Sequence, residues 1–164
     1  MLRPMGERVS AVLVTLCFVR ADERVLLLRA GEGKDRFRGL WNGLGGHVRP
    51  GEDMRAAARR EVCEESGLEP RKLRLRALIH ETGLLGRPHL LSVFSAEVNP
   101  SEVWSAPRAS TEGELRWFGL NEIPWDELVP DLRLLLPRLL EGDALLFGTQ
   151  EFDGDDRPLR LRLS

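Results

Sequence analysis

Residues 46–68 constrain this chain more than any other stretch, because they combine a glycine-containing turn with one well-delimited helix. Asp53 is the type of residue that caps a first helical turn, and alanines and other good helix formers follow it. Gly67 stands where helices commonly end in the left-handed conformation. The pattern therefore predicts a helix over residues 54–66.

Glutamates crowd one face of this predicted helix. Glu61, Glu64 and Glu65 recur at spacings of three and four residues, which places their carboxylates on a common arc. Like charges one turn apart destabilise a helix by roughly 0.2–0.5 kcal/mol unless a positive group neutralises them. Oxygen-only ligands favour Mg²⁺ or Mn²⁺ over zinc, so this face is a candidate cation site. The alternative is a solvated helix face laced with ion pairs.

The order of glycines and charged residues in this stretch resembles the Nudix box. The box reads Gly, five residues, Glu, seven residues, Arg-Glu, an aliphatic residue, any residue, Glu-Glu, any residue, Gly and an aliphatic residue. The resemblance implies an α/β fold, namely the Nudix α/β/α sandwich with a mixed sheet and a catalytic helix. It also implies Mg²⁺-dependent hydrolysis of a diphosphate linked to another group, usually a nucleoside. The matching positions are Gly46, Glu52, Arg60, Glu61, Val62, Glu64, Glu65, Gly67 and Leu68.

The resemblance further implies roles for these residues. Arg60 and Glu52 are expected to pair with each other and to orient the acidic cluster. Magnesium is the expected metal, and manganese is a possible substitute for it. The expected metal ligands are Glu61, Glu64 and Glu65, helped by the backbone carbonyl of Gly45 or Gly46.

Nudix enzymes often recruit one further carboxylate from a loop after the box. In this chain the resemblance points to Glu112, in preference to Glu114. The general base stays open among Glu61, Glu64 and Glu112. The sequence contains no nucleophile elbow and no P-loop pattern, so attack by metal-activated water is the expected chemistry.

Outside the box, the chain resembles the MutT-type branch of the family, and especially the animal oxidised-purine nucleoside triphosphatases. The similar stretches are residues 41–46, residues 115–125 and the closing segment from Leu145. In that branch, the asparagine at the position of Asn42 contacts the purine edge, and a turn role beside Gly43 is the alternative. The resemblance implies hydrolysis of 8-oxo-dGTP, or a related dNTP, to the monophosphate and pyrophosphate.

One segment departs from that branch. Where the animal enzymes have Trp-Pro-Asp-Asp at the base pocket, this chain has Val-Pro-Asp-Leu, so a ring and a carboxylate are missing. Asp131 is retained as a candidate base ligand, with Phe37 and Arg36 as the next candidates. Lys34 and Arg38 of the same basic loop are candidate phosphate contacts, and solvated surface charge is the alternative.

Two other functions remain compatible with the sequence. One alternative is a Nudix hydrolase of another nucleoside diphosphate derivative, and the other is a Nudix-fold module that senses a nucleotide with little turnover. An intact box favours hydrolysis over sensing, because sensing does not need the complete set of charged residues.

The remaining apolar runs predict a sheet and one further helix. Leucines at helical spacing favour a helix over residues 125–140, with Leu134, Leu135, Leu139 and Leu140 in the core. The acidic run at 153–156 is typical of a hairpin turn and lacks the ligand pattern of a calcium loop. Strands are predicted at residues 9–19, 24–29, 41–48, 72–81, 89–98, 115–120, 144–152 and 158–163.

Composition bounds the domain organisation and the partners. The chain has 164 residues, 42% of them hydrophobic, which suits a single domain over residues 1–164. A net charge of −2 favours a small nucleotide over a nucleic-acid polymer or an anionic membrane. Neither a membrane span nor a signal peptide is recognisable, so a cytoplasmic monomer or homodimer is expected. Cys17 and Cys63 are predicted to be buried free thiols.

Overall fold

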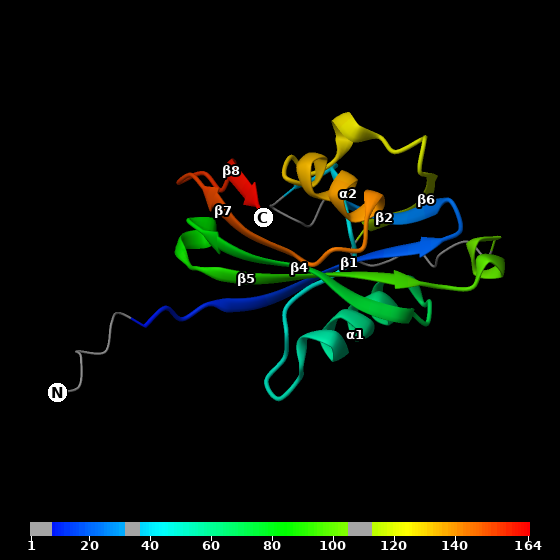
Figure 1. Cartoon of the computed structure of the whole chain (residues 1–164), viewed down its shortest axis with the longest axis horizontal. Helices are drawn as coiled ribbons and strands as arrows, with labels where there is room; N and C mark the ends of the chain where they lie inside the picture. The colour runs from blue at the N-terminus through cyan, green and yellow to red at the C-terminus, as the bar shows by residue number, and fades with distance from the viewer. Residues whose placement is uncertain (1–7, 32–36, 105–112) are drawn as a thin grey trace.

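The computed structural model describes residues 8–31, 37–104 and 113–164, which form a mixed sheet with a helix on each face (Figure 1). The sheet has the order β3-β2-β1-β5-β4-β7-β8, and β6 pairs with β2. This arrangement confirms the predicted α/β/α sandwich. The strands are β1 (Val12–Ala21), β2 (Arg24–Ala30), β3 (Trp41–Asn42), β4 (Arg71–Thr82), β5 (His89–Glu97), β6 (Gly113–Gly119), β7 (Leu146–Phe152) and β8 (Pro158–Leu163).

Strand directions bring three strand ends together at one end of the sheet. β1 runs parallel to β5, with Val12 opposite His89, and β4 runs antiparallel to β5, with Glu81 opposite His89. The last residues of β4 therefore lie beside the first residues of β5, and these lie beside the first residues of β1. β4 is also parallel to β7, which leads into the closing β7–β8 hairpin. A pocket lined by Glu81 and His89 lies at this end.

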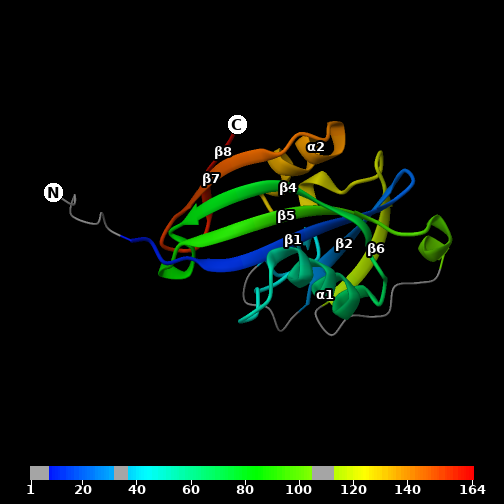
Figure 2. The ribbon, with the colours of Figure 1, turned by 60° about the horizontal axis from the view of Figure 1, so that its bottom comes forward.

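The first helix, α1 (Met54–Ser66), covers one face of the sheet (Figure 2). The Asp53 carboxylate accepts the Ala56 N–H at 2.9 Å, and Gly67 ends the helix at a φ of 73°. Alanines and Val62 on its inner side are fully buried against the sheet. Local capping and an apolar face explain why the predicted helix over residues 54–66 is confirmed at both ends.

The second helix, α2 (Leu132–Glu141), covers the opposite face and begins later than predicted. A short 3-10 helix, η3 (Trp125–Glu127), precedes it, and the intervening residues are not helical. Pro130 disfavours a helical conformation at Val129, whose N–H donates instead to the Trp41 carbonyl at 3.0 Å. Leu135 and Leu139 are buried as predicted, but the prediction for Leu134 was wrong, because its exposed fraction is 59%.

Two smaller features also differ from expectation. The predicted strand over residues 41–48 has only two residues in β3, and the rest runs along β1 through isolated bridges. Two connections between strands contain the short 3-10 helices η1 (Leu84–Gly86) and η2 (Pro100–Trp104). Cys17 and Cys63 are both free, but only Cys17 is buried. Within the described ranges, the helices are too short or too polar to cross a membrane.

Candidate active site

The loop ahead of α1 is held closely against β1. Leu44 and Cys17 exchange two backbone hydrogen bonds of 2.6 and 3.0 Å, and the Thr15 N–H donates to the Gly46 carbonyl at 2.9 Å. A Cβ on Gly45 would lie 2.0 Å from the Thr15 carbonyl oxygen, so only glycine permits this approach. We call residues 43–46 the glycine strip. Its position against β1 fixes where backbone groups meet the acidic face of α1.

Arg60 binds three carboxylates at once. Its Nε and Nη2 donate to the two carboxylate oxygens of Glu52 at 2.8 and 2.9 Å, which makes a bidentate pair. Its Nη1 donates to Glu61 at 2.6 Å and to Glu64 at 3.1 Å, and Nη2 also reaches the His47 carbonyl at 3.0 Å. The expected pairing of Arg60 with Glu52 is therefore present. Its role in orienting the cluster stays a prediction.

Charge pairing shifts the titration of both partners. The hydrogen bond from Arg60, with a further one from the Arg49 backbone N–H, holds the pKa of Glu52 at about 2. The same contact, together with the hydrogen bond to Glu61, raises the pKa of Arg60. Because the pKa of Glu52 is lowered on folding, the pair stabilises the fold fully above about pH 5. That contribution is lost as the pH falls toward 2.

The three glutamates of α1 occupy different environments. Glu61 lies directly against the glycine strip, since a Cβ on Gly46 would be 2.6 Å from its Oε1. Glu65 is 7% exposed and accepts the Gly45 N–H at 3.0 Å. Glu64 is the outermost, with 47% of its side chain exposed. Glu61 and Glu65 thus face the strip, whereas Glu64 lies further out and contacts Arg49 and Arg60.

Carboxylates and a backbone carbonyl are the donors that Mg²⁺ prefers, so Glu61, Glu64, Glu65 and the Gly46 carbonyl fit such an ion chemically. Among the residues that the structure describes, however, no three acidic, histidine or cysteine side chains are arranged as a metal cage. Arg60 Nη1 contacts both Glu61 and Glu64 and neutralises them. A cation held by the same oxygens would compete with Arg60 for them.

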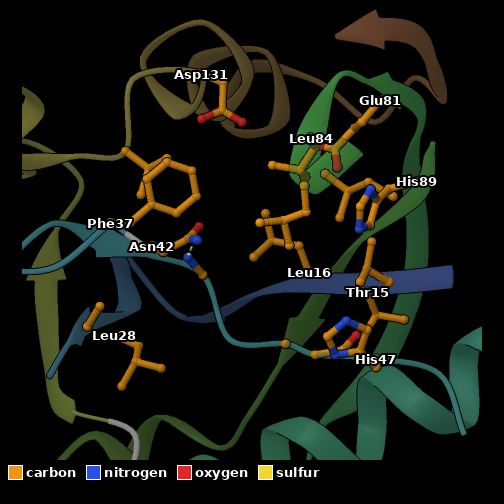
Figure 3. A pocket seen from close by; sticks show the side chains of 18 of the residues that line it. Thr15, Leu16, Leu28, Phe37, Asn42, His47, Glu81, Leu84, His89 and Asp131 are labelled. Carbon is orange, nitrogen blue, oxygen red and sulfur yellow. Dashed lines mark hydrogen bonds between the residues drawn. The ribbon is translucent and has the colours of Figure 1, made fainter. Parts of the chain in front are cut away.

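A pocket of about 350 Å³ lies beside this cluster (Figure 3). Its floor includes Leu16 of β1, which belongs to the core between the sheet and α2, so the pocket opens on the α2 side. One end of the pocket is formed by the glycine strip and Glu65. Its lining also includes Asn42 of β3, with Phe37 beside it, and Asp131 next to α2.

Asn42 and Asp131 are positioned by one backbone contact. The Val129 N–H donates to the Trp41 carbonyl at 3.0 Å, which ties the segment before α2 to β3. This contact therefore brings together the two segments of chain that carry Asn42 and Asp131. The Asn42 Oδ1 also accepts the Gly43 N–H at 2.8 Å, so the turn contact proposed as the alternative is present, although the side chain lines the pocket as well.

Other predicted residues divide into three groups. Phe37 lines the pocket, whereas Arg38 is exposed and does not line it. Leu132, which stands where the animal enzymes have a second carboxylate, is 1% exposed and packs in the core between the sheet and α2. Glu114 is 56% exposed and is also outside the pocket lining. The predictions for Lys34, Arg36 and Glu112 concern positions outside the described residues.

The pocket wall formed by β4 and β5 was not predicted from the sequence. Glu81 and His89 line the pocket and are buried, and neither belongs to the box. The alternation of β4 contained a signal for this, because Ala77, Ile79 and Glu81 lie two residues apart and share one face. An acidic residue at the end of that apolar series marks the point where the core gives way to the pocket.

Comparison with known proteins agrees with this geometry. A model of the NUDIX domain matches residues 9–139. The oxidized purine nucleoside triphosphate hydrolase of Mus musculus is 39% identical over 137 residues, which cover 79% of this chain and 80% of that protein. Its Danio rerio counterpart is 35% identical over 153 residues, 90% of each chain. The crystal structure of a MutT protein from Bacillus halodurans has a TM-score of 0.76 at 26% identity and covers 93% of this chain and 97% of that one. The chain therefore belongs to the Nudix hydrolase family.

Proposed function

We propose that this Nudix hydrolase is a Mg²⁺-dependent pyrophosphohydrolase of nucleoside triphosphates. The proposed substrate is 8-oxo-dGTP or a related dNTP, and the products are the nucleoside monophosphate and pyrophosphate. One observation carries the proposal: a pocket of about 350 Å³, large enough for a nucleobase, ends at Gly45, Gly46 and Glu65. A nucleotide whose base fills this pocket would direct its phosphates toward the acidic face of α1.

In this proposal the metal is held by Glu61, Glu64, Glu65 and the Gly46 carbonyl. A divalent ion bound there would neutralise phosphate oxygens and lower the pKa of the attacking water. Glu52 orients the cluster by keeping the Arg60 guanidinium in place through the bidentate pair.

The proton of the attacking water needs an acceptor close to the cluster. Candidates for this general base are Glu61, Glu64 and Glu112. Glu61 is the more enclosed of the two helix residues, at 15% side-chain exposure against 47% for Glu64. Glu61 also lies against Gly46 at the end of the pocket, which favours it over Glu64 by position.

Preference for an oxidised purine is supported by relatives and by the pocket. Two relatives at 39% and 35% identity are named oxidized purine nucleoside triphosphate hydrolases. Asn42 of β3 and Asp131 next to α2 line the pocket and offer an amide and a carboxylate for the edge of a base (Figure 3).

Pyrophosphate release from purified protein tests the proposal. With Mg²⁺ present, 8-oxo-dGTP should give the monophosphate and pyrophosphate, and EDTA should abolish the release. Glu64→Gln should lower turnover at saturating Mg²⁺ by at least about a hundredfold, because it removes a charged metal ligand. A variant that keeps more than half of the turnover would show that the metal site is assigned wrongly.

The same assay separates the competing functions. A panel of dGTP, dCTP, ADP-ribose, nucleotide sugars and dinucleoside polyphosphates should be hydrolysed more slowly than 8-oxo-dGTP. Faster hydrolysis of a compound without a triphosphate would identify another nucleoside diphosphate derivative as the substrate. Tight nucleotide binding without product release at any Mg²⁺ concentration would identify a sensing module.

A further inference from the structure

Two polar side chains outside the Nudix box form the pocket wall across from Asn42. Glu81 ends the inward face of β4 and His89 begins β5, and their exposed fractions are 6% and 5%. Both line the pocket, and they are direct cross-strand partners. Figure 3 shows them on one side of the cavity, with Phe37 and Asn42 on the other.

The orientation of His89 is fixed by the backbone. Its Nδ1 lies 2.9 Å from the Arg87 carbonyl oxygen. A carbonyl oxygen can only accept a hydrogen bond, so Nδ1 must carry the hydrogen. This contact and the strand register together hold the ring beside Glu81. The wall is therefore built by the fold and does not depend on a bound ligand for its position.

The surroundings of Glu81 are those of a ligand-facing group. Ala77 and Ile79 precede it on the same face of β4 and belong to the core under α2. Leu16, Leu84 and Leu91 line the cavity around it. A carboxylate among aliphatic side chains is costly unless hydrogen bonds satisfy it. Glu81 lines the cavity, so an oxygen of its carboxylate can accept a hydrogen bond from a molecule that enters.

We propose that Glu81, positioned by His89, is a specificity-determining residue that accepts a hydrogen bond from an N–H group of the bound base. This inference rests on the proposed function and identifies which feature of an oxidised purine the pocket recognises. In guanine, N7 carries a lone pair. In 8-oxoguanine, oxidation at C8 leaves a hydrogen on N7. A carboxylate accepts from the second base and repels the first, so Glu81 would favour the oxidised form.

Binding to the unmodified protein gives the first test. The Kd values of 8-oxo-dGMP, dGMP and 8-bromo-dGMP are measured by calorimetry. Bromine adds bulk at C8 but leaves the N7 lone pair, so it separates recognition of the N7 hydrogen from recognition of shape. We expect 8-oxo-dGMP to bind at least about tenfold more tightly than either of the others, the order of one hydrogen bond to a buried group. Equal Kd values for 8-oxo-dGMP and 8-bromo-dGMP, or no binding of 8-oxo-dGMP, would overturn the inference.

Substitution of Glu81 gives the second test. The amide in Glu81→Gln can donate as well as accept, so it can pair with either form of N7. We expect the ratio of the Kd values for dGMP and 8-oxo-dGMP to fall by about tenfold, partly through tighter binding of dGMP. The matched control is Glu97→Gln on β5, whose side chain is 54% exposed and pairs with Lys72 away from the pocket. An unchanged ratio in Glu81→Gln would overturn the inference.

His89 is a positioning residue in this proposal, and its variants should behave accordingly. His89→Leu removes the donor to the Arg87 carbonyl and should lower the same Kd ratio. His89→Gln keeps a donor at that side chain and should restore part of the ratio. If both variants melt at the wild-type temperature and keep the wild-type ratio, His89 has no part in base selection.

Binding of monophosphates separates this inference from the proposed function. Discrimination without hydrolysis of 8-oxo-dGTP would leave the role of Glu81 standing and remove the proposed activity. Hydrolysis of 8-oxo-dGTP with an unchanged Kd ratio in Glu81→Gln would keep the activity and remove the role. If Glu81→Gln fails to fold, the comparison of 8-oxo-dGMP with 8-bromo-dGMP on the wild-type protein decides alone.

Discussion

Arg60 contributes more to this site than its positive charge. Its guanidinium contacts Glu52, Glu61 and Glu64 and also a backbone carbonyl, which uses the planar, forked arrangement of its donors. A lysine has the charge but offers only a single ammonium group. The geometry of the acidic face therefore depends on arginine itself.

Arg60→Lys should lower kcat/KM by roughly ten- to a hundredfold, because the carboxylates lose the fork that spaces them. The neighbouring Arg59→Lys is the matched control, since Arg59 pairs only with the exposed Glu69 among the contacts described. Steady-state kinetics at saturating Mg²⁺ would compare the two. Equal losses in both variants would show that the fork has no special role.

Cys17 shows how burial makes a thiol inert. The residue is fully buried in the core beneath α1, and burial, with a smaller effect from Glu65, raises the pKa of its thiol to about 12. The unfolded chain ionises this thiol near pH 8.5–9, so the folded state binds one more proton above that pH. Stability that is fully present below about pH 8.5 is therefore lost as the pH rises toward 12.

Between pH 8 and 10, the free energy of unfolding should fall by about 1.5 kcal/mol more in the wild type than in Cys17→Ala. Urea unfolding at both pH values measures this difference, and the contribution of Cys63 cancels because both proteins contain it. Cys63 is only partly buried and should react with a thiol reagent in the native state, while Cys17 should react only after unfolding. Parallel pH dependences in the two proteins would contradict the assignment.

Helix α1 joins the acidic face to the sheet, so its ends matter for the site. The Asp53 carboxylate satisfies one backbone N–H of the first turn. Asp53→Ala should cost about 1 kcal/mol of unfolding free energy, whereas Asp53→Asn should cost only a few tenths, because asparagine also caps well. Thermal and urea denaturation would measure both. A loss of the same size in the two variants would mean that charge, and not the cap, is responsible.

The two helices also show which helix boundaries can be predicted from the sequence. All the signals for α1 are local: a capping Asp53, an apolar face and Gly67 at the end. The start of α2 depends on a distant contact, because Val129 donates to Trp41 across the sheet. Leucine spacing alone could not reveal that contact, and the face assigned to Leu134 was therefore wrong.

The same distinction between local signals and distant contacts applies to the candidate active site. The acidic face and the Arg60 pair follow from one continuous stretch, whose spacing encodes their geometry. The pocket is assembled from β1, β4, β5 and the segment before α2, so its lining depends on strand order and register. The strand register places Glu81 opposite His89, and this pairing could not be predicted from the sequence of either strand alone. The packing of α2 buries Leu132 in the core, which depends on contacts that are distant in the sequence.

At the scale of the whole molecule, the two faces of the sheet support different parts of the candidate active site. The core beneath α1 supports the acidic face, and the core beneath α2 surrounds the pocket. β1 contributes to both, because Leu16 and Cys17 point to opposite faces. The glycine strip runs beside these residues, where the acidic face and the pocket meet.

The closing hairpin braces the far wall of the pocket. Asp156 Oδ1 accepts the Leu85 N–H at 2.7 Å, which ties the turn between β7 and β8 to η1. A Cβ on Gly83 would lie 2.3 Å from the Phe152 carbonyl oxygen, so η1 and the hairpin approach closely. Leu84 and Leu85 of η1 line the pocket. The C-terminal strands therefore position part of the pocket wall from a distance.

Removal of the Asp156 contact should loosen that wall without disturbing the acidic face. Asp156 has a φ of 58°, so Asp156→Gly removes the acceptor and at the same time relieves the backbone. We expect KM for the nucleotide to rise about three- to tenfold, the order of one hydrogen bond, while kcat changes less than twofold. Asp155→Gly in the same turn is the control, because its exposed carboxylate makes only a 3.8 Å ion pair with Arg157. A fall in kcat at unchanged KM would place the effect of the hairpin on the acidic face and not on the pocket.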